Sequence, residues 1–378
     1  MKQVSLPLIM CGTILALLLA ACARQPQPAR IEEITFRSGE FTIVGELRTP
    51  EGTGPFPVVL FVHGSGPADR TGFGMYLPVM ERLQQAGYAT FAWDKPGTGE
   101  STGSLENGHV HSQRAQILLD AIEVLKAHPN IDPGQIGLWG ISQAGYVMPR
   151  ALAQSKDIAF MICVSCPGMS SYDQMAFQVT AFALCDGASE EKADEQASLL
   201  AELDQARTYE TYAEYLYYRE VLEALAGLAP APVEKWPILA KEAWQEGDPD
   251  REALWNPIEV IEQTTIPVLA IFGDRDRNID PLQGAHAYRV ALEGAGNLQS
   301  RVEVFPKANH GIAVSETGCP DDDLQWLEQS AKSLGYASIG EAQEALQKGA
   351  SNHELLSKIP YAPGYLDTMD EWLRDLQR

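Results

Sequence analysis

The sequence of 378 residues contains 28 Lys and Arg against 51 Asp and Glu, which gives a formal net charge of −23, and 45% of its residues are hydrophobic. This composition is ordinary for a folded chain and excludes a largely disordered one. Binding to nucleic acid needs clustered Lys and Arg, so the acidic balance excludes a nucleic-acid-binding protein. The sequence has only one long uninterrupted apolar run, which excludes a protein with several membrane spans.

The apolar run lies at the N-terminus and has the features of an export signal. A lysine at position 2 precedes the apolar residues 6–21, and Leu19-Ala20-Ala21-Cys22 closes the segment. This ending resembles the lipobox of bacterial lipoproteins. The resemblance implies that residues 1–21 are a signal peptide and that Cys22 is lipidated; an ordinary signal cleaved near the same alanines is the alternative.

The residues after the signal predict where the protein resides. Residues 22–30 contain two prolines and are expected to form a short flexible tether. If Cys22 is lipidated and the source is Gram-negative, Ala23 after the cysteine favours delivery of the protein to the outer membrane. We therefore expect a protein of the bacterial cell envelope, anchored to the membrane by lipid and facing the periplasm or the cell surface.

From residue 31 onward, short strand-like runs alternate with helical stretches, as in an α/β fold with a mostly parallel sheet and helices on both of its faces. A Ser-Gly-Glu turn between the first two runs predicts a hairpin. The expected strands are 31–37, 41–48, 58–62, 89–93, 135–139, 158–164, 267–272 and 301–305, and the expected helices are 76–86, 112–127, 143–153, 281–292 and 365–376.

Two segments interrupt this alternation. Residues 168–262 hold 20 acidic against 6 basic residues and have no convincing strand, so they are expected to form a helical lid inserted into the α/β domain of residues 31–378. The tyrosines of the lid follow a near-helical spacing, at Tyr209, Tyr212, Tyr215 and Tyr218. The second interruption, residues 313–359, precedes the last helix.

Four cysteines remain after removal of the signal and Cys22. They allow three full disulfide pairings, and the sequence does not choose among them. Cys163 and Cys166 have the spacing of a redox pair but lie in and just after an apolar run, so a buried strand is the better interpretation. No second Cys/His cluster completes a zinc site, so we expect no metal.

The central motif is residues 136–145, with the sequence IGLWGISQAG. It places Ser142 at a sharp turn between a predicted strand and a predicted helix, which is the context of a nucleophile elbow. Such a turn requires small residues on either side of the nucleophile, and Gly140 and Ala144 meet this requirement. We therefore expect Ser142 to be a catalytic nucleophile.

A serine nucleophile needs a base, which is in turn oriented by an acid, and both are expected in loops after later strands. His310 is the only histidine that follows a late strand, so it is the expected base. Asp274 and Asp276 both lie in the loop after the strand 267–272, and the residues alone leave both open as the acid.

Acyl transfer also needs donors for an oxyanion, usually two backbone amides. The amide of Gln143, next to the nucleophile, is the first expected donor. The strand 58–62 runs into a Gly-rich turn, His63-Gly64-Ser65-Gly66-Pro67, and we expect the amide of Ser65 to be the second donor.

These motifs together resemble the α/β-hydrolase fold, close to bacterial serine carboxylesterases and to the dienelactone-hydrolase and prolyl-oligopeptidase branch. The resemblance spans residues 58–311 and selects Asp276 over Asp274, because the family's acid usually ends a Gly-x-x-Asp motif. Departures are Ala144 in place of Gly, Pro96 where Arg is common, and the long stretch after His310. The motifs that carry the resemblance are HGSGPADR from residue 63, DKPGTGES from residue 94, WGISQAG from residue 139, GDRD from residue 273 and NHG from residue 309.

The resemblance implies a serine hydrolase that cleaves carboxylic esters through an acyl-enzyme on Ser142, with no cofactor. The acidic lid must expose its charge and bury its apolar side chains, so we expect it to cover a pocket of limited volume that prefers short or medium acyl chains. A serine peptidase is the first alternative, although a prolyl-oligopeptidase carries a propeller for which this chain has no room before its first strands. An acyltransferase or thioesterase would use the same residues. A lipid-anchored binding protein without activity is the alternative from another class, and the oligomeric state stays open.

Overall fold

The computed structural model of the chain describes residues 29–105, 110–193, 255–333 and 359–378, together with residues 213, 216, 335–338 and 341. The predicted signal and lipidated Cys22 lie outside the described residues. Most of the predicted lid, with its tyrosine-rich stretch, also lies outside them.

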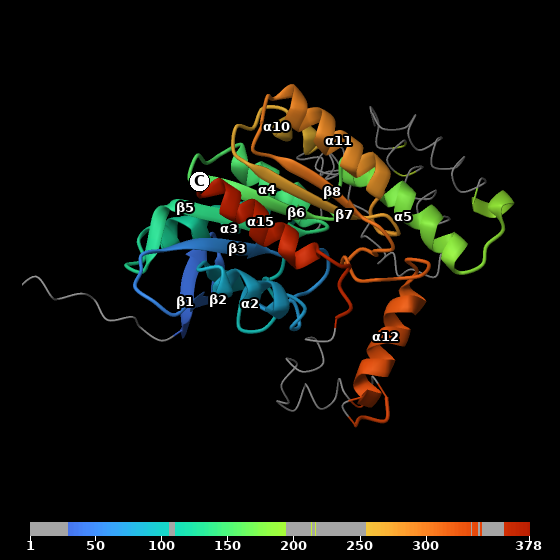
Figure 1. The fold of residues 1–378 in the computed structure, drawn as a ribbon, viewed down its shortest axis with the longest axis horizontal. Coiled ribbons are helices and arrows are strands. Elements are labelled where there is room, and N and C mark those ends of the chain that lie inside the picture. Colours follow the sequence, from blue (N-terminus) through green and yellow to red (C-terminus); the bar gives the residue numbers. More distant parts are fainter. Residues whose placement is uncertain are drawn as a thin grey trace, which may run out of the picture.

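The described part contains one eight-stranded sheet, which Figure 1 shows running from β1 and β2 at one end to β7 and β8 at the other. The strand order is β1-β2-β4-β3-β5-β6-β7-β8; the two pairs that involve β2 are antiparallel and all others are parallel. The predicted hairpin and mostly parallel sheet are therefore confirmed. The strands are β1 (Arg30–Ser38), β2 (Phe41–Thr49), β3 (Phe56–Val62), β4 (Ala89–Trp93), β5 (Ile131–Ile141), β6 (Ile158–Val164), β7 (Val268–Gly273) and β8 (Arg301–Phe305).

Helices cover both faces of the sheet. On one face, α3 (Val110–Lys126), α4 (Ala144–Leu152), α10 (Ile258–Ile261) and α11 (Pro281–Gly294) pack on one core cluster. On the other face, α2 (Leu77–Gln85) and α15 (Tyr365–Leu376) pack on a second cluster. Within β3, Leu60 contributes to the first cluster and Phe61 to the second. Burial on both faces explains why the central strands are continuously apolar in sequence.

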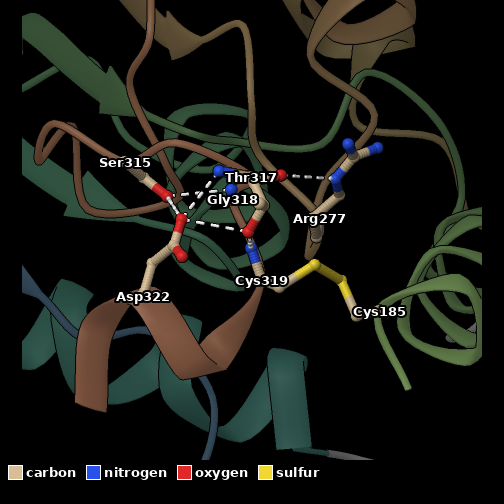
Figure 2. Close-up of a disulfide and its surroundings, with 7 residues drawn as sticks. All are labelled: Cys185, Arg277, Ser315, Thr317, Gly318, Cys319 and Asp322. Atoms are coloured by element: carbon tan, nitrogen blue, oxygen red, sulfur yellow. Dashed lines mark hydrogen bonds between the residues drawn. A yellow bond between two sulfur atoms is a disulfide. The ribbon is translucent and has the colours of Figure 1, made fainter. Parts of the chain in front are cut away.

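The first part of the predicted lid, after β6, is helix α5 (Ser171–Cys185), and a helix the sequence did not predict, α12 (Pro320–Ser333), follows the loop of His310. Both extend away from the sheet in Figure 1. A disulfide joins Cys185 at the end of α5 to Cys319 just before α12 (Figure 2). Cys163 and Cys166 are buried free thiols, so the structure has this one bridge in place of any of the three full pairings that the sequence allowed.

Asp322 in the first turn of α12 holds the chain that leads into this helix. Figure 2 shows its carboxylate accepting hydrogen bonds from the hydroxyl of Ser315 and from both the amide and the hydroxyl of Thr317. Arg277 donates to the carbonyl of Thr317 at 3.1 Å. The segment after His310 is thereby connected to the loop that follows β7. Among the described residues, no helix combines the length and apolar character needed to cross a membrane.

Candidate active site

Ser142 lies in the turn between β5 and α4, and its backbone adopts a left-handed conformation with φ of 58°. For a residue other than glycine this conformation is strained and must be enforced by the surroundings. The amide of Ser142 donates to the carbonyl of Val164 at 3.0 Å, which ties the turn to the end of β6. A methyl group placed on Gly140 would lie 2.6 Å from Cβ of Ala144, so the elbow has no room for a side chain there.

His310 and Asp276 form a hydrogen-bonded pair, with 2.8 Å between Nδ1 of the histidine and Oδ2 of the aspartate. Because a carboxylate only accepts hydrogen bonds, Nδ1 carries the hydrogen, and Nε2 of the neutral ring is left as a proton acceptor. Asp276 is 1% exposed, and its other oxygen accepts from the amides of Asn278 and Ile279 at 2.8 and 3.0 Å. Asp274 is exposed, so of the two aspartates the structure brings Asp276 to the histidine.

Two further residues hold the histidine loop, and neither was singled out in the sequence for this role. The hydroxyl of Ser165, which follows β6, donates to the carbonyl of His310 at 2.9 Å. The side-chain oxygen of Asn309 accepts from the amides of Gly311 and Ala313 at 3.0 and 2.9 Å. Asn309 precedes the expected base within the Asn-His-Gly motif, but only the fold shows that Ser165 lies beside it.

The Gly-rich turn after β3 lies against the elbow. A methyl group placed on Gly64 would lie 3.4 Å from Cβ of Ser142, so the two segments are in contact at this point. Ser65 is exposed. Within the ranges that the structure describes, neither the amide of Ser65 nor that of Gln143 has a hydrogen-bond partner. Both expected oxyanion donors are therefore available to a ligand.

Two buried basic side chains contact the carbonyls on the back of this turn. Lys95, which follows β4 and is 4% exposed, donates from Nζ to the carbonyls of Gly64 and Gly66 at 2.6 and 2.5 Å. Arg114 on α3, also 4% exposed, donates to the carbonyl of His63 and to the side-chain oxygen of Gln143. Burial, together with the nearby charge of Arg114, lowers the pKa of Lys95 to about 6. In the sequence, Lys95 was noted only as part of the motif that begins at residue 94. Arg114 was not predicted to be a site residue, because it lies in an ordinary helical stretch.

The same turn is tied to the segment after β4 by a buried ion pair. Asp94 is 1% exposed and accepts from the side chain of Arg70 at 2.8 and 3.2 Å and from its amide at 2.7 Å. Burial acts to raise the pKa of Asp94, but the hydrogen bonds from Arg70 and from the amide of Glu100 outweigh it and lower the pKa. The motifs that begin at residues 63 and 94 thus form one connected unit behind the elbow.

His63 is a buried structural histidine at the start of the turn. Its Nε2 donates to the carbonyl of Trp93 at 2.6 Å, which leaves Nδ1 to accept from the hydroxyl of Tyr76 at 3.2 Å. Burial, followed by the charge of Lys95, lowers the pKa of His63 to about 3. Because the ring is neutral and both of its nitrogens are occupied, His63 has no free position from which to act as a base.

The arrangement combines a serine hydroxyl on a strained backbone, an imidazole paired with a buried carboxylate, and two backbone amides that have no partner among the described residues. These are the groups that nucleophilic attack on a carbonyl requires: a nucleophile, a base with its orienting acid, and donors for the resulting oxyanion. Within the part of the chain that the structure describes, no group of three or more His, Cys, Asp or Glu side chains is placed to hold a metal ion.

The chain is similar in sequence to a thiohydrolase and to an uncharacterized protein. The chain is 29% identical over 143 residues to the thiohydrolase aneE of Aspergillus aculeatus, covering 36% of this chain and 43% of that protein. It thus spans less than half of that relative. An uncharacterized 31.7 kDa protein of Escherichia coli, from the traX-finO intergenic region, is 25% identical over 272 residues, which cover 68% of this chain and 85% of that protein.

Among solved structures, the esterase Pf2001 of Pyrococcus furiosus superposes with a TM-score of 0.48 at 17% identity, over 75% of this chain and 84% of the esterase. The model of the X-Pro dipeptidyl-peptidase family, S15, matches residues 42–304, which is more than half of the chain. This chain is therefore a member of the X-Pro dipeptidyl-peptidase (S15) family, within the α/β-hydrolase superfamily.

Proposed function

We propose that the protein is a serine hydrolase that cleaves small carboxylic esters. The hydroxyl of Ser142 attacks the acyl carbonyl while Nε2 of His310 takes its proton, and Asp276 stabilises the resulting imidazolium. The oxyanion accepts hydrogen bonds from the amides of Ser65 and Gln143. His310 returns the proton to the departing alcohol, and a water molecule, deprotonated by the same histidine, then releases the acid from the acyl-enzyme.

The observation that carries this proposal is the 2.8 Å pair of His310 with a buried Asp276, formed at the carboxyl edge of the sheet where the elbow of Ser142 also lies. A fluorophosphonate probe tests it, because the probe phosphonylates an activated serine. We expect labelling and hydrolysis of p-nitrophenyl acetate by the wild type, and neither by Ser142→Ala. The variant Ser104→Ala, a serine away from the elbow, is the matched control and should be labelled normally. Hydrolysis by folded Ser142→Ala would refute the assignment.

A peptidase is the second candidate, and the family match favours it, since that family is described by cleavage after X-Pro. Both activities would use Ser142, so only the leaving group separates them. The measurement is kcat/KM for p-nitrophenyl esters against dipeptidyl X-Pro p-nitroanilides. We expect the esters to be preferred. Because one relative is a thiohydrolase, an acyl thioester belongs in the same panel.

We also propose that the insertion after β6 covers the site and sets its acyl-chain preference. Supporting this, α5 lies against the loop of the acid: Gln174 and Gln178 donate to the carbonyl and side chain of Asn278 at 2.6 and 2.9 Å. We expect short and medium acyl chains to be preferred over long ones. Replacing residues 190–254 by a short linker should broaden the acyl-length profile, and an unchanged profile would exclude the insertion as the specificity element.

For location, we propose that the mature protein begins at a lipidated Cys22 in a bacterial cell envelope. The disulfide between Cys185 and Cys319 supports export, because such bonds persist in oxidising compartments. Mass spectrometry of the protein from bacterial membranes should find Cys22 acylated. Cys22→Ser should block this modification, whereas Cys11→Ser, inside the signal, should not. A soluble unmodified wild type would reject the anchor.

A further inference from the structure

The turn after β3 consists of peptide groups whose carbonyls are held by buried side chains. In a trans peptide the C=O and N–H bonds point in opposite directions, so fixing a carbonyl also fixes the direction of the amide in the same plane. The carbonyl of Gly64 shares its peptide plane with the amide of Ser65. Lys95 donates to that carbonyl at 2.6 Å. The amide of Ser65 must therefore point away from Lys95.

The preceding peptide group is held in the same way. Arg114 donates to the carbonyl of His63, which also fixes the direction of the Gly64 amide in the same plane. Lys95 also donates to the carbonyl of Gly66 at 2.5 Å. The carbonyls of Gly64 and Gly66, on either side of Ser65, thus both accept from the side-chain amine of Lys95, while the amide of Ser65 has no partner among the described residues.

Arg114 also connects the turn to the elbow. Besides the carbonyl of His63, its guanidinium contacts the side-chain oxygen of Gln143. The backbone amide of Gln143 is the other expected oxyanion donor. One guanidinium therefore spans the two segments that supply the amides. Because Gly64 contacts Ser142, a shift of either segment would change the separation between the amides and the serine.

We propose that Lys95 and Arg114 are positioning residues for the oxyanion site. By binding carbonyls on the far side of the turn after β3, they direct the backbone amide of Ser65 toward the space beside Ser142. They also fix its position relative to the backbone amide of Gln143. This inference rests on the proposed function. A hydrogen bond from a side-chain donor also polarises the peptide group that accepts it, which strengthens the amide as a donor. An amine has at least two N–H bonds in either protonation state, so Lys95 can hold both carbonyls when charged or neutral.

The test compares binding of the transition state with binding of the substrate. A trifluoromethyl ketone with a short alkyl chain is attacked by the hydroxyl of Ser142; the new C–O bond converts the carbonyl to an alkoxide, and the serine proton passes to His310. The resulting adduct needs the oxyanion site, whereas KM for p-nitrophenyl acetate depends on it much less. Lys95→Met should weaken inhibition by the ketone and lower kcat in parallel, each by about 10- to 100-fold, with KM changed less than about 3-fold.

The controls separate positioning from general stability. Arg82→Met removes the ion pairs that Arg82 on α2 makes with Asp367 and Asp370 on α15, and none of these residues contacts the carbonyls of residues 63–66, so it should lower Tm while keeping the ratio of ketone affinity to KM. Arg114→Lys and Lys95→Gln retain part of the donor set and should give intermediate losses; they also serve if Lys95→Met fails to fold. A folded Lys95 or Arg114 variant with unchanged ketone affinity and kcat would overturn the inference. A wild type that neither reacts with fluorophosphonate nor hydrolyses the ester would instead overturn the proposed function, and this inference with it.

Discussion

The nucleophile half of the site, residues 63–66 with Ser142 and Gln143, is held differently from the acid–base half, Asp276 and His310. In the first half, buried basic side chains donate to backbone carbonyls. In the second, backbone amides donate to the carboxylate of Asp276, and one hydroxyl donates to the carbonyl of His310. The difference follows from what each half presents to a substrate. The nucleophile half must offer amides, so the carbonyls of the same peptides need donors behind them. The acid–base half must offer Nε2 of His310, so its carboxylate needs donors on its remaining oxygen.

The comparison also has an electrostatic side. In the proposed reaction a negative charge develops on the oxyanion beside Ser142 and a positive charge develops on His310. The buried guanidinium of Arg114 lies behind the first, and the buried carboxylate of Asp276 lies behind the second. Each developing charge therefore faces a fixed group of opposite sign in a region of low dielectric, where such interactions are stronger than in water.

The largest expected effect comes from breaking the acid–base half at its carboxylate. Asp276→Asn replaces the acceptor with a side chain that disfavours the tautomer with hydrogen on Nδ1, so kcat/KM for p-nitrophenyl acetate should fall by about 10³- to 10⁴-fold. Asp274→Asn, at an exposed position in the same loop, is the matched control and should stay within a factor of about 3 of the wild type. The opposite order would assign the acid to Asp274.

A second way to disturb the acid–base half is through its covalent connection. The bridge between Cys185 and Cys319 closes a loop with a sequence separation of 134, and removing it with Cys185→Ser/Cys319→Ser should lower the free energy of unfolding by about 2–5 kcal/mol. Urea unfolding with and without reductant measures the effect. The wild type should lose stability on reduction and the double variant should not. Equal sensitivity of both proteins would mean that the bridge does not contribute.

The nucleophile half should be the more sensitive to acid through His63. Folding lowers its pKa from 6.5 to about 3, so below pH 6.5 the unfolded chain takes up a proton that the folded chain does not. The stability that His63 contributes is present above pH 6.5 and is lost as the pH falls from 6.5 toward 3. Between pH 7.5 and 4.5 this amounts to about 2–3 kcal/mol. His63→Gln, which does not titrate in this range, should show a correspondingly smaller loss in urea unfolding; an equal loss would contradict the prediction.

The smallest expected effect concerns the hydroxyl of Ser165, which holds the carbonyl of His310. Ser165→Ala should cost about 1 kcal/mol of stability, the usual value for one hydrogen bond, and should lower kcat by less than about 10-fold. Ser300→Ala is the matched control: Ser300 accepts from the amide of Val268 at 2.9 Å, where β7 begins, which is the edge of the sheet away from the site. We expect the two variants to lose similar stability, with kcat reduced only in Ser165→Ala. That result would show that the hydroxyl of Ser165 acts on the acid–base half, whereas an equal reduction of kcat in both variants would contradict it.

Much of the fold could be predicted from the sequence because it depends on local patterns. A strand buried on both faces is continuously apolar, and residues 158–164 are predicted and observed with the same limits as β6. Capping is equally local: Asp280 immediately precedes the helix that starts at Pro281 and accepts from the amides of Leu282 and Gln283. Helix α12 was missed, since it lies away from the sheet and lacks the apolar pattern that marks the core helices.

The sequence by itself determined the strands and most of the helices that cover the sheet, in their order along the chain, and placed Ser142, Asp276 and His310 after three of the strands, because motif spacing and apolar periodicity are properties of neighbouring residues. Only the tertiary structure decided which aspartate contacts His310, which cysteines pair, and what Lys95 and Arg114 bind. Those outcomes depend on contacts between segments far apart in the chain, as between Cys185 and Cys319. Such contacts depend on which strands pair side by side in the sheet, and no local sequence pattern encodes that order.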